Sequence, residues 1–179
     1  MSRRPGIALQ RGFTLVEAII TLMIVSIAVL AITSVLSFGV SRSADGLWQA
    51  KAVGLAESYI EQIMARRFDE QTPLGGVPAC SATTVACTPV GAFDDGEPRA
   101  DFDDVDDFHG VDDIPALDGD GAPIPGYERY RVEVDVTYPD AAQQAELGLT
   151  QADDAKIITV TVTAPAQRPM AFRVVKANF

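Results

Sequence analysis

The sequence predicts an α+β protein, in which a long N-terminal helix packs on a small antiparallel sheet and a long acidic loop region lies between them. Three observations support this fold class. Residues 18–41 form an unbroken apolar run, residues 47–68 carry apolar side chains at helical spacing, and the C-terminal part alternates apolar and polar residues. A period near 3.6 residues is typical of a helix, and a period of two is typical of a half-buried strand. A helix and a sheet with one apolar face each bury both faces by packing together.

The apolar run is long enough to cross a membrane. Residues 18–41 are 24 consecutive uncharged residues. At about 1.5 Å per residue this helix would be about 36 Å long, which exceeds the roughly 30 Å hydrocarbon core. A secretory signal has an apolar core of only about 7–15 residues, so the run predicts a transmembrane helix. Arg3, Arg4 and Arg11 precede the run, which predicts a cytoplasmic N-terminus.

The helix is expected to continue beyond the run. Its second part has apolar residues at helical spacing: Leu47, Ala52, Leu55, Ala56, Tyr59, Ile60, Ile63 and Met64. They form one stripe, which predicts the face that packs on the sheet. Trp48 and Tyr59 are interpreted as packing residues. Arg66 and Arg67 are expected in the last turn, where they suit the negative end of the helix dipole, and Pro73 ends the element.

The C-terminal part predicts three strands. Residues 130–138 alternate apolar and charged side chains, and residues 156–164 and 170–177 are rich in β-branched residues. The five-residue link between the last two strands is short enough for a hairpin. The longer link 139–155 contains Ala, Gln and Glu, which predicts a helical turn or two. Residues 73–126 hold most of the Pro and Gly and are expected to be irregular.

Charge is strongly segregated along the chain. The formal net charge is −11, and the first 12 residues contain three arginines and no acid, so the remainder carries 11 basic and 25 acidic residues, net −14. Between Asp94 and Asp120 there are 12 acidic residues against one arginine, Arg99. Nucleic-acid binding needs clustered Lys and Arg that displace counterions from phosphates, so this composition argues against a nucleic-acid partner.

Two cysteines lie close together in the stretch CSATTVAC. Cys80 and Cys87 can close a small loop as a disulfide in an oxidising compartment, and this interpretation is favoured. Free thiols and a fragment of a metal site are the alternatives. A zinc site needs four ligands, which are hard to assemble in a chain whose single histidine is His109.

The acidic region raises the question of calcium. The nearest loop, with Asp118 and Asp120, departs from the EF-hand pattern because Ala122 and Arg129 stand at its fifth and twelfth positions. Asp106 and Asp107 belong to a second group of carboxylates, which could bind one ion only if the fold brought their oxygen atoms together. A solvated acidic surface is the favoured interpretation. No cofactor is therefore expected, with calcium at Asp118, Asp120, Asp106 or Asp107 as the alternative.

No pattern of residues supports an enzyme. There is no Ser/His/Asp grouping, no glycine-rich phosphate loop after a strand, and one histidine. Pairs of aspartates could act as acid and base, but a segment with 12 acids contains such pairs by chance. His109 is interpreted as structural or solvent-facing. We expect a protein without catalytic residues.

The sharpest local pattern is Gly12-Phe13-Thr14-Leu15-Val16-Glu17, which leads directly into the apolar run. This segment resembles the type IV prepilin and pseudopilin signature, with a basic leader, Gly before the cleaved bond and Glu five residues after it. The resemblance implies a pilin-like fold, cleavage between Gly12 and Phe13 by a prepilin peptidase, and N-methylation of Phe13. It also implies that Glu17 pairs with the Phe13 amine of a neighbouring subunit during assembly.

The residues fit those roles chemically. Gly12 has no Cβ, so an extended backbone can enter a protease cleft at this position. Glu17 is the one charge in the hydrophobic stretch, and such a charge costs about 2.5 kcal/mol or more in a membrane unless it is paired. The alternative is that Glu17 lies at the membrane interface of an uncut signal anchor, which would carry a periplasmic binding domain.

Other stretches are similar to MSHA-pilus minor pilins of the MshD kind: residues 64–73, 78–80 and 104–110. A general-secretion or PilV-like minor pseudopilin, which shares the same N-terminus, is the main alternative. Many major pilins have a proline about 22 residues into the mature chain, and Ser34 stands there in this sequence.

The resemblance implies an organisation and a set of partners. Residues 1–12 would be the leader peptide, residues 13–42 the transmembrane and assembly half of the helix, and residues 43–179 a periplasmic globular domain. The implied partners are prepilin peptidase, other pilin subunits and an inner-membrane assembly platform. The chain would be inserted in a bacterial inner membrane and then enter a pilus at the cell surface, where cell adhesion is a function of such filaments.

Overall fold

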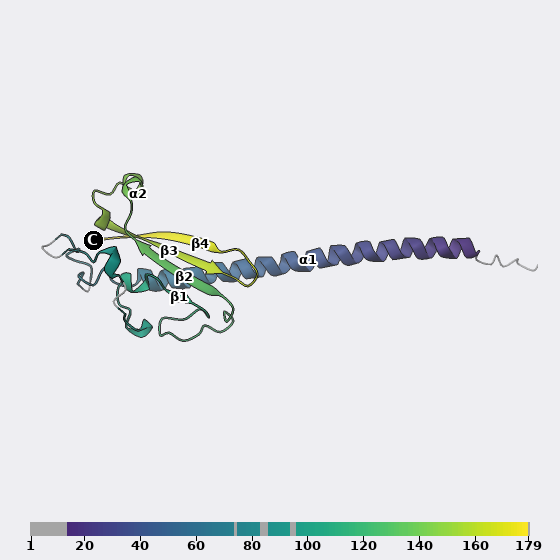
Figure 1. Cartoon of the computed structure of the whole chain (residues 1–179), viewed down its shortest axis with the longest axis horizontal. Helices are drawn as coiled ribbons and strands as arrows, with labels where there is room; N and C mark the ends of the chain where they lie inside the picture. Colours follow the sequence, from purple (N-terminus) through teal and green to yellow (C-terminus); the bar gives the residue numbers. More distant parts are fainter. Residues whose placement is uncertain (1–13, 74, 83–85, 94–95, 179) are drawn as a thin grey trace, which may run out of the picture. The chain divides into compact units, whose positions relative to one another are not determined.

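The structure is a computed structural model that describes residues 14–73, 75–82, 86–93 and 96–178, except for the side chains of residues 37–44. The predicted fold class is confirmed: a long apolar helix and a four-stranded antiparallel sheet form an α+β protein (Figure 1). Residue contacts divide the chain into two compact units, Met1–Ala44 and Asp45–Phe179.

Helix α1 runs from Leu15 to Met64, so that its first part belongs to one unit and its second part to the other. In the second unit its buried residues follow helical spacing: Ala52, Leu55, Ala56, Tyr59 and Ile63 are at most 2 % exposed. This is the core of the predicted stripe. Leu47 and Met64 were also counted in the apolar pattern but are exposed, because both lie at the ends of the face that the sheet covers.

The sheet has the strand order β1-β2-β3-β4 with antiparallel neighbours throughout. Its strands are β1 (Asp112–Asp113), β2 (Arg131–Thr137), β3 (Ala155–Thr163) and β4 (Met170–Ala177). The three predicted strands are therefore confirmed to within a residue or so of their ends. The two-residue β1 was not predicted, because a strand so short shows no alternation.

The core lies between α1 and one face of the sheet. The helix-facing residues are Val132, Val134 and Val136 on β2, and Ile158, Val160 and Val162 on β3, none more than 3 % exposed. In the antiparallel register Val134 lies opposite Val160. The alternate residues, among them Glu133 and Thr161, face away from the helix, as a period of two requires.

A short helix, α2 (Ala141–Leu147), occupies the link between β2 and β3, as the helical turn or two expected there. Asp140 caps it by accepting hydrogen bonds from the N–H groups of Ala142 and Gln143. Gly148 ends it with φ 70°, a left-handed conformation that glycine adopts without strain.

Four single-turn 3₁₀ helices lie in the described loops: Val90–Ala92, Arg99–Asp101, Asp106–Phe108 and Ala152–Asp154. Three of them fall within the region that was expected to be irregular. That region is ordered by its packing on the core rather than by regular elements, since Phe93, Val105 and Phe108 are at most 1 % exposed.

A fully buried ion cluster lies at one end of the core. The Lys156 ammonium, 0 % exposed, donates to the Phe68 carbonyl at 2.7 Å and to Asp69 Oδ2 at 3.0 Å. It also lies 2.6 Å from Asp106 Oδ1. The ring of Phe68 is 4.4 Å from the ammonium, and that of Phe93 is 5.1 Å away. Charges taken out of water cost several kcal/mol each unless they are paired, and here the pairing joins three segments of the chain.

A second lysine caps the end of α1. The Lys176 ammonium on β4 donates hydrogen bonds to the carbonyls of Met64 and Arg66. The prediction that Arg66 and Arg67 lie in the last helical turn was wrong, because α1 ends at Met64. Arg67 instead pairs with Glu70 and with Asp103. The positive charge at this helix end is therefore supplied from the sheet rather than from the helix itself.

We predict that Lys156→Met lowers the free energy of unfolding by about 3–5 kcal/mol, because it leaves the Asp69 carboxylate buried without its cation. Thermal unfolding of the full chain in mild detergent, followed by circular dichroism, would measure the loss. Lys51→Met is the matched control, since Lys51 is partly exposed and forms no ion pair with a described carboxylate, and its ammonium contacts the Gly126 carbonyl and the Tyr127 ring. A Lys156→Met chain as stable as the control would contradict the structural role of the cluster.

Candidate functional site

The first candidate site is the start of α1. Thr14 precedes the helix, and its Oγ1 accepts a hydrogen bond from the Glu17 N–H at 3.2 Å, while its carbonyl accepts from the Ala18 N–H at 3.1 Å. Thr14 is therefore the N-cap, and Glu17 is the third residue of the helix. Sequence reasoning missed this role, although Thr14-Leu15-Val16-Glu17 has the T-x-x-E spacing that is typical of a helix start.

The helix that follows is apolar on all sides. Residues Leu15–Leu36 have a mean hydropathy of 2.7, and no residue of the most apolar window is buried. The four hydroxyl groups of this segment donate to carbonyls of the preceding turn: Thr21, Ser26, Thr33 and Ser34. Hydroxyl groups satisfied in this way can face lipid, because hydrocarbon offers them no other partner. The segment thus fits a single membrane-spanning helix.

Glu17 is the one charged residue in Leu15–Leu36. Its carboxylate forms no hydrogen bond or ion pair with the part of the chain that the structure describes, although its backbone N–H is held by Thr14. The position in the first helical turn favours a negative charge, since the helix dipole is positive there. The predicted cleavage and methylation residues, Gly12 and Phe13, lie outside the described residues.

The second candidate site is the cysteine pair. Cys80 and Cys87 are joined by a disulfide, with Cα atoms 5.0 Å apart. Cys80 is 2 % exposed, and its carbonyl accepts a hydrogen bond from Asn178 Nδ2. The same amide nitrogen donates to the Asp153 carbonyl. The disulfide loop is thereby tied to the end of the chain just after β4.

The acidic residues named as calcium candidates do not converge. Asp118 Oδ1 accepts from the N–H groups of Asp120 and Ala122, so its carboxylate closes its own turn. Asp107 Oδ2 accepts from the N–H groups of Asp103 and Asp104 in its own loop, and Asp106 contacts Lys156. Two groups of metal-competent side chains occur among the described residues, and neither contains any of these four aspartates.

Both groups of metal-competent side chains are already engaged within the protein. One consists of Asp69 with the two cysteines, whose sulfur atoms are joined to each other. The other consists of Glu70, Asp103 and Asp104, and the guanidinium of Arg67 pairs with the first two. The protein's own cations thus balance carboxylates that a metal ion would otherwise have to neutralise.

Burial sets the pKa values of the cluster around Lys156. Desolvation raises the pKa of Asp106 to about 8, although the nearby ammonium acts in the opposite direction. Desolvation and the Asp107 charge raise the pKa of Asp104 to about 6. Burial also acts to raise the pKa of Asp69, but the Lys156 charge and N–H donors from Gln71 and Thr88 outweigh it and lower that pKa. One buried ammonium therefore balances one buried carboxylate, and the second carboxyl retains its proton more easily.

The remaining candidates have structural partners. His109 Nδ1 accepts a hydrogen bond from the Val136 N–H, and its ring lies against Phe93. The Tyr59 hydroxyl donates to Asp113 Oδ2 at 2.6 Å, and burial together with this bond raises the Tyr59 pKa. The Trp48 ring packs on that of Tyr130 at 5.8 Å between centroids. These contacts fit the packing roles assigned from the sequence.

Comparison with known families bears on the first candidate site. A model described as the prokaryotic N-terminal methylation motif matches residues 7–33. The first segment of this chain carries that methylation motif. The match supports the type IV prepilin and pseudopilin family, and it spans Thr14, Glu17 and most of the apolar helix. Searches of curated proteins and of solved structures found no significant match.

We predict that stability falls as pH rises from about 4 to about 8. The Asp106 pKa of about 8 lies far above its ordinary value of 3.8, so in this window the folded chain keeps a proton that the unfolded chain releases. The slope from one such group is at most about 1.4 kcal/mol per pH unit. Asp106→Asn should flatten this decline, and the exposed Asp101→Asn should not. Thermal unfolding across this pH range tests it, and parallel profiles for both variants would contradict it.

Proposed function

We propose that this chain is a minor pilin or pseudopilin subunit that a prepilin peptidase cleaves between Gly12 and Phe13. The observation that carries the proposal is the methylation motif at residues 7–33, which runs into a helix that is apolar on every side. A soluble domain buries one stripe of a helix and leaves the rest polar, whereas a helix exposed to lipid or packed within a helical bundle is apolar all round.

In this proposal each residue of the motif has a physical role. The basic residues before Gly12 keep the leader in the cytoplasm, where the peptidase cuts. Cleavage would create a new amine on Phe13, immediately before the Thr14 cap, and methylation would modify that amine. An ammonium at a helix N-terminus opposes the helix dipole, so a carboxylate nearby is favourable.

The proposed assembly contact follows from Glu17. A carboxylate in an apolar environment is costly by about 2.5 kcal/mol or more unless it is paired, and this one has no described partner within its own chain. The Phe13 amine of a neighbouring subunit would supply the missing charge. Apolar packing of neighbouring helices would then hold the filament, with the Glu17 pair fixing the register between subunits.

For the filament type we propose an MSHA-type pilus, with a general-secretion or PilV-like minor pseudopilin as the alternative. The stretches 64–73, 78–80 and 104–110 support this choice. The first and third stretches lie together, since Arg67 forms a β-bridge with Asp104, and Lys156 contacts both Asp69 and Asp106. The proposed location is the inner membrane with a periplasmic C-terminal domain, followed by the pilus. The proposed partners are the peptidase, other pilin subunits and the assembly platform.

We predict that the chain extracted from membranes begins at N-methylated Phe13. Intact mass with N-terminal fragmentation, in cells with an active prepilin peptidase, measures this directly. Cells lacking the peptidase are the control and should yield the uncut chain. A chain that retains residues 1–12 in both strains would identify an uncleaved signal anchor that carries a periplasmic domain.

We predict that Glu17→Ala leaves cleavage largely intact but strongly reduces incorporation into filaments, because the Phe13 amine of the neighbour loses its partner. The ratio of sheared filament-bound protein to membrane-bound protein measures the effect. Glu57→Ala is the matched control, since Glu57 is an exposed glutamate on the same helix. Normal incorporation of Glu17→Ala would contradict the assembly role.

A further inference from the structure

The two long edges of the sheet differ in how they are covered. Beyond β2, the loop residues Gly110 and Val111 exchange backbone hydrogen bonds with Val134, and β1 continues the pairing. Arg131 adds a two-bond contact to Asp112 on the same side. This edge is closed by the chain itself.

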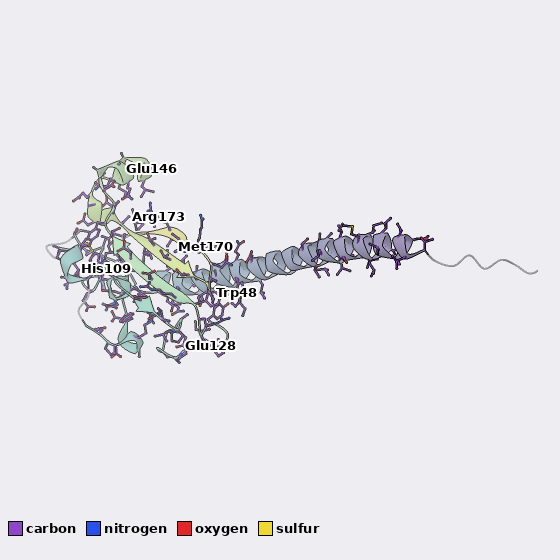
Figure 2. The ribbon with its side chains drawn as sticks, turned by 45° about the vertical axis from the view of Figure 1, so that its right-hand side comes forward. Trp48, His109, Glu128, Glu146, Met170 and Arg173 are labelled. Atoms are coloured by element: carbon purple, nitrogen blue, oxygen red, sulfur yellow. A yellow bond between two sulfur atoms is a disulfide. The ribbon has the colours of Figure 1, made fainter. Side chains whose placement is uncertain are left out.

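The β4 edge is open in the part of the chain that the structure describes. All eight residues of β4 pair with β3, from Met170 opposite Val162 to Ala177 opposite Ala155. No backbone hydrogen bond joins β4 to another described segment. An antiparallel strand paired on one side leaves about half of its backbone N–H and C=O groups facing outward. The edge therefore presents a row of unused backbone groups to a partner, on the strand that carries the labelled side chains of Met170 and Arg173 (Figure 2).

The core is also incomplete at this edge. On β3 the helix-facing Ile158, Val160 and Val162 are 0 % exposed. The corresponding residues on β4 are only half-buried, although they pack against the same core: Met170, Phe172 and Val174. A further strand beside β4 would cover the sides of these three residues that remain exposed, and burial of apolar area favours association.

Basic side chains follow the β4 edge in a chain that is otherwise acidic. Arg168 precedes the strand, Arg173 lies on its outer face, and Lys176 and Arg66 lie near its end. Among the described residues, none of these four side chains forms an ion pair with a carboxylate. They contrast with Arg67, Arg99, Arg131 and Lys156, all of which do.

Surface hollows lie at both ends of the strand. One, of about 480 Å³, is lined by Trp48, Arg168 and Met170 among others. The other, of about 330 Å³, is lined by Arg66, Lys176 and the Gly75-Gly76 turn among others. Each hollow combines apolar surface with a cation, so each could take a side chain from the two ends of a strand that lies along β4.

We infer that the open β4 edge binds an extended, acidic segment of another polypeptide, which adds a fifth strand to the sheet. Main-chain hydrogen bonds would supply affinity, and pairing with Arg168 and Arg173 would select an acidic sequence. The same cations disfavour pairing between the β4 edges of two copies, since such a contact would bring like charges together. The surface lies wholly within Asp45–Phe179, so the inference goes beyond the proposed function and does not depend on cleavage after Gly12.

The test places the photoreactive residue p-benzoylphenylalanine at Val175 of the full chain, in the membranes of cells that produce it. Val175 is 39 % exposed on the outer face of β4. Irradiation should yield an adduct with a polypeptide, and fragmentation should map it to an extended segment of negative net charge. The adduct is measured on chains with and without residues 1–12, so a failure of leader cleavage does not affect this result. The same photoreactive residue at the exposed Glu146 of α2 should not give this adduct.

Variants at Arg173 then test the charge selection. We expect Arg173→Glu to reduce the Val175 adduct by about tenfold, which corresponds to about 1.4 kcal/mol, and Arg173→Lys to retain it. Both variants change an exposed side chain, so the fold should be unaffected. The inference is overturned if Val175 gives no polypeptide adduct or an adduct only to lipid. It is also overturned if the adduct lies on a helical or basic segment or on β4 of a second copy, or if the adduct survives Arg173→Glu.

Discussion

The fold of the C-terminal unit depends on a single buried ammonium. Lys156 enters the core from β3, where the neighbouring inward positions are occupied by Ile158 and Val160. Its charge can remain there only because Phe68 and Asp69, which follow α1, and Asp106, in the acidic region, supply oxygen atoms. The segment after α1 and the single-turn helix Asp106–Phe108 are thus fixed to the sheet, because Asp69 balances the buried ammonium and Asp106 lies against it.

This constraint explains how a chain with so many acidic residues forms a compact unit. Within the acidic region, three carboxylates pair with arginines: Asp113 faces Arg99 of the same region, Asp112 faces Arg131, and Asp103 faces Arg67. Each pair joins residues that are more than ten positions apart in sequence. Ion pairs with an exposed partner, such as those of Asp112 and Asp103, contribute little individually. The buried cluster therefore contributes most to the order of the region, and the Cys80–Cys87 disulfide closes the loop between Asp69 and Asp106.

The regular elements could be predicted from sequence because their signals are local. Alternation over residues 130–138 and the stripe from Ala52 to Ile63 arise from one strand and one helix. The end of α1 and the pairing of β1 could not be predicted in this way, because both depend on partners distant in sequence. Lys176 on the last strand donates to the carbonyl of Met64, the last residue of α1, and β2 supplies the partner of Asp112–Asp113.

Two informative residues could have been found by the same local reasoning. Lys156 stands two, four and six residues before Ile158, Val160 and Val162, so the alternation of a strand places all four on the same face. That face is buried, and a buried lysine requires a partner for its charge. Thr14 stands three residues before Glu17, which is the spacing of a capped helix start. The identity of the Lys156 partners was beyond sequence reasoning, because a segment with 12 acids offers too many equivalent carboxylates.

The pattern of α1 changes where the two units divide. From Leu15 to Leu36 the side chains are apolar on every side and exposed, whereas from Ala52 to Ile63 one narrow stripe is apolar and buried. One helix thus meets two requirements. The first part suits surroundings that are themselves apolar, such as lipid or neighbouring helices, and the second suits a sheet on one side and water on the other. Glu17 is the exception in the first part. A carboxylate costs free energy in lipid, so it requires a partner of opposite charge. The methylation motif spans residues 7–33, so it contains both this glutamate and most of the apolar part of the helix.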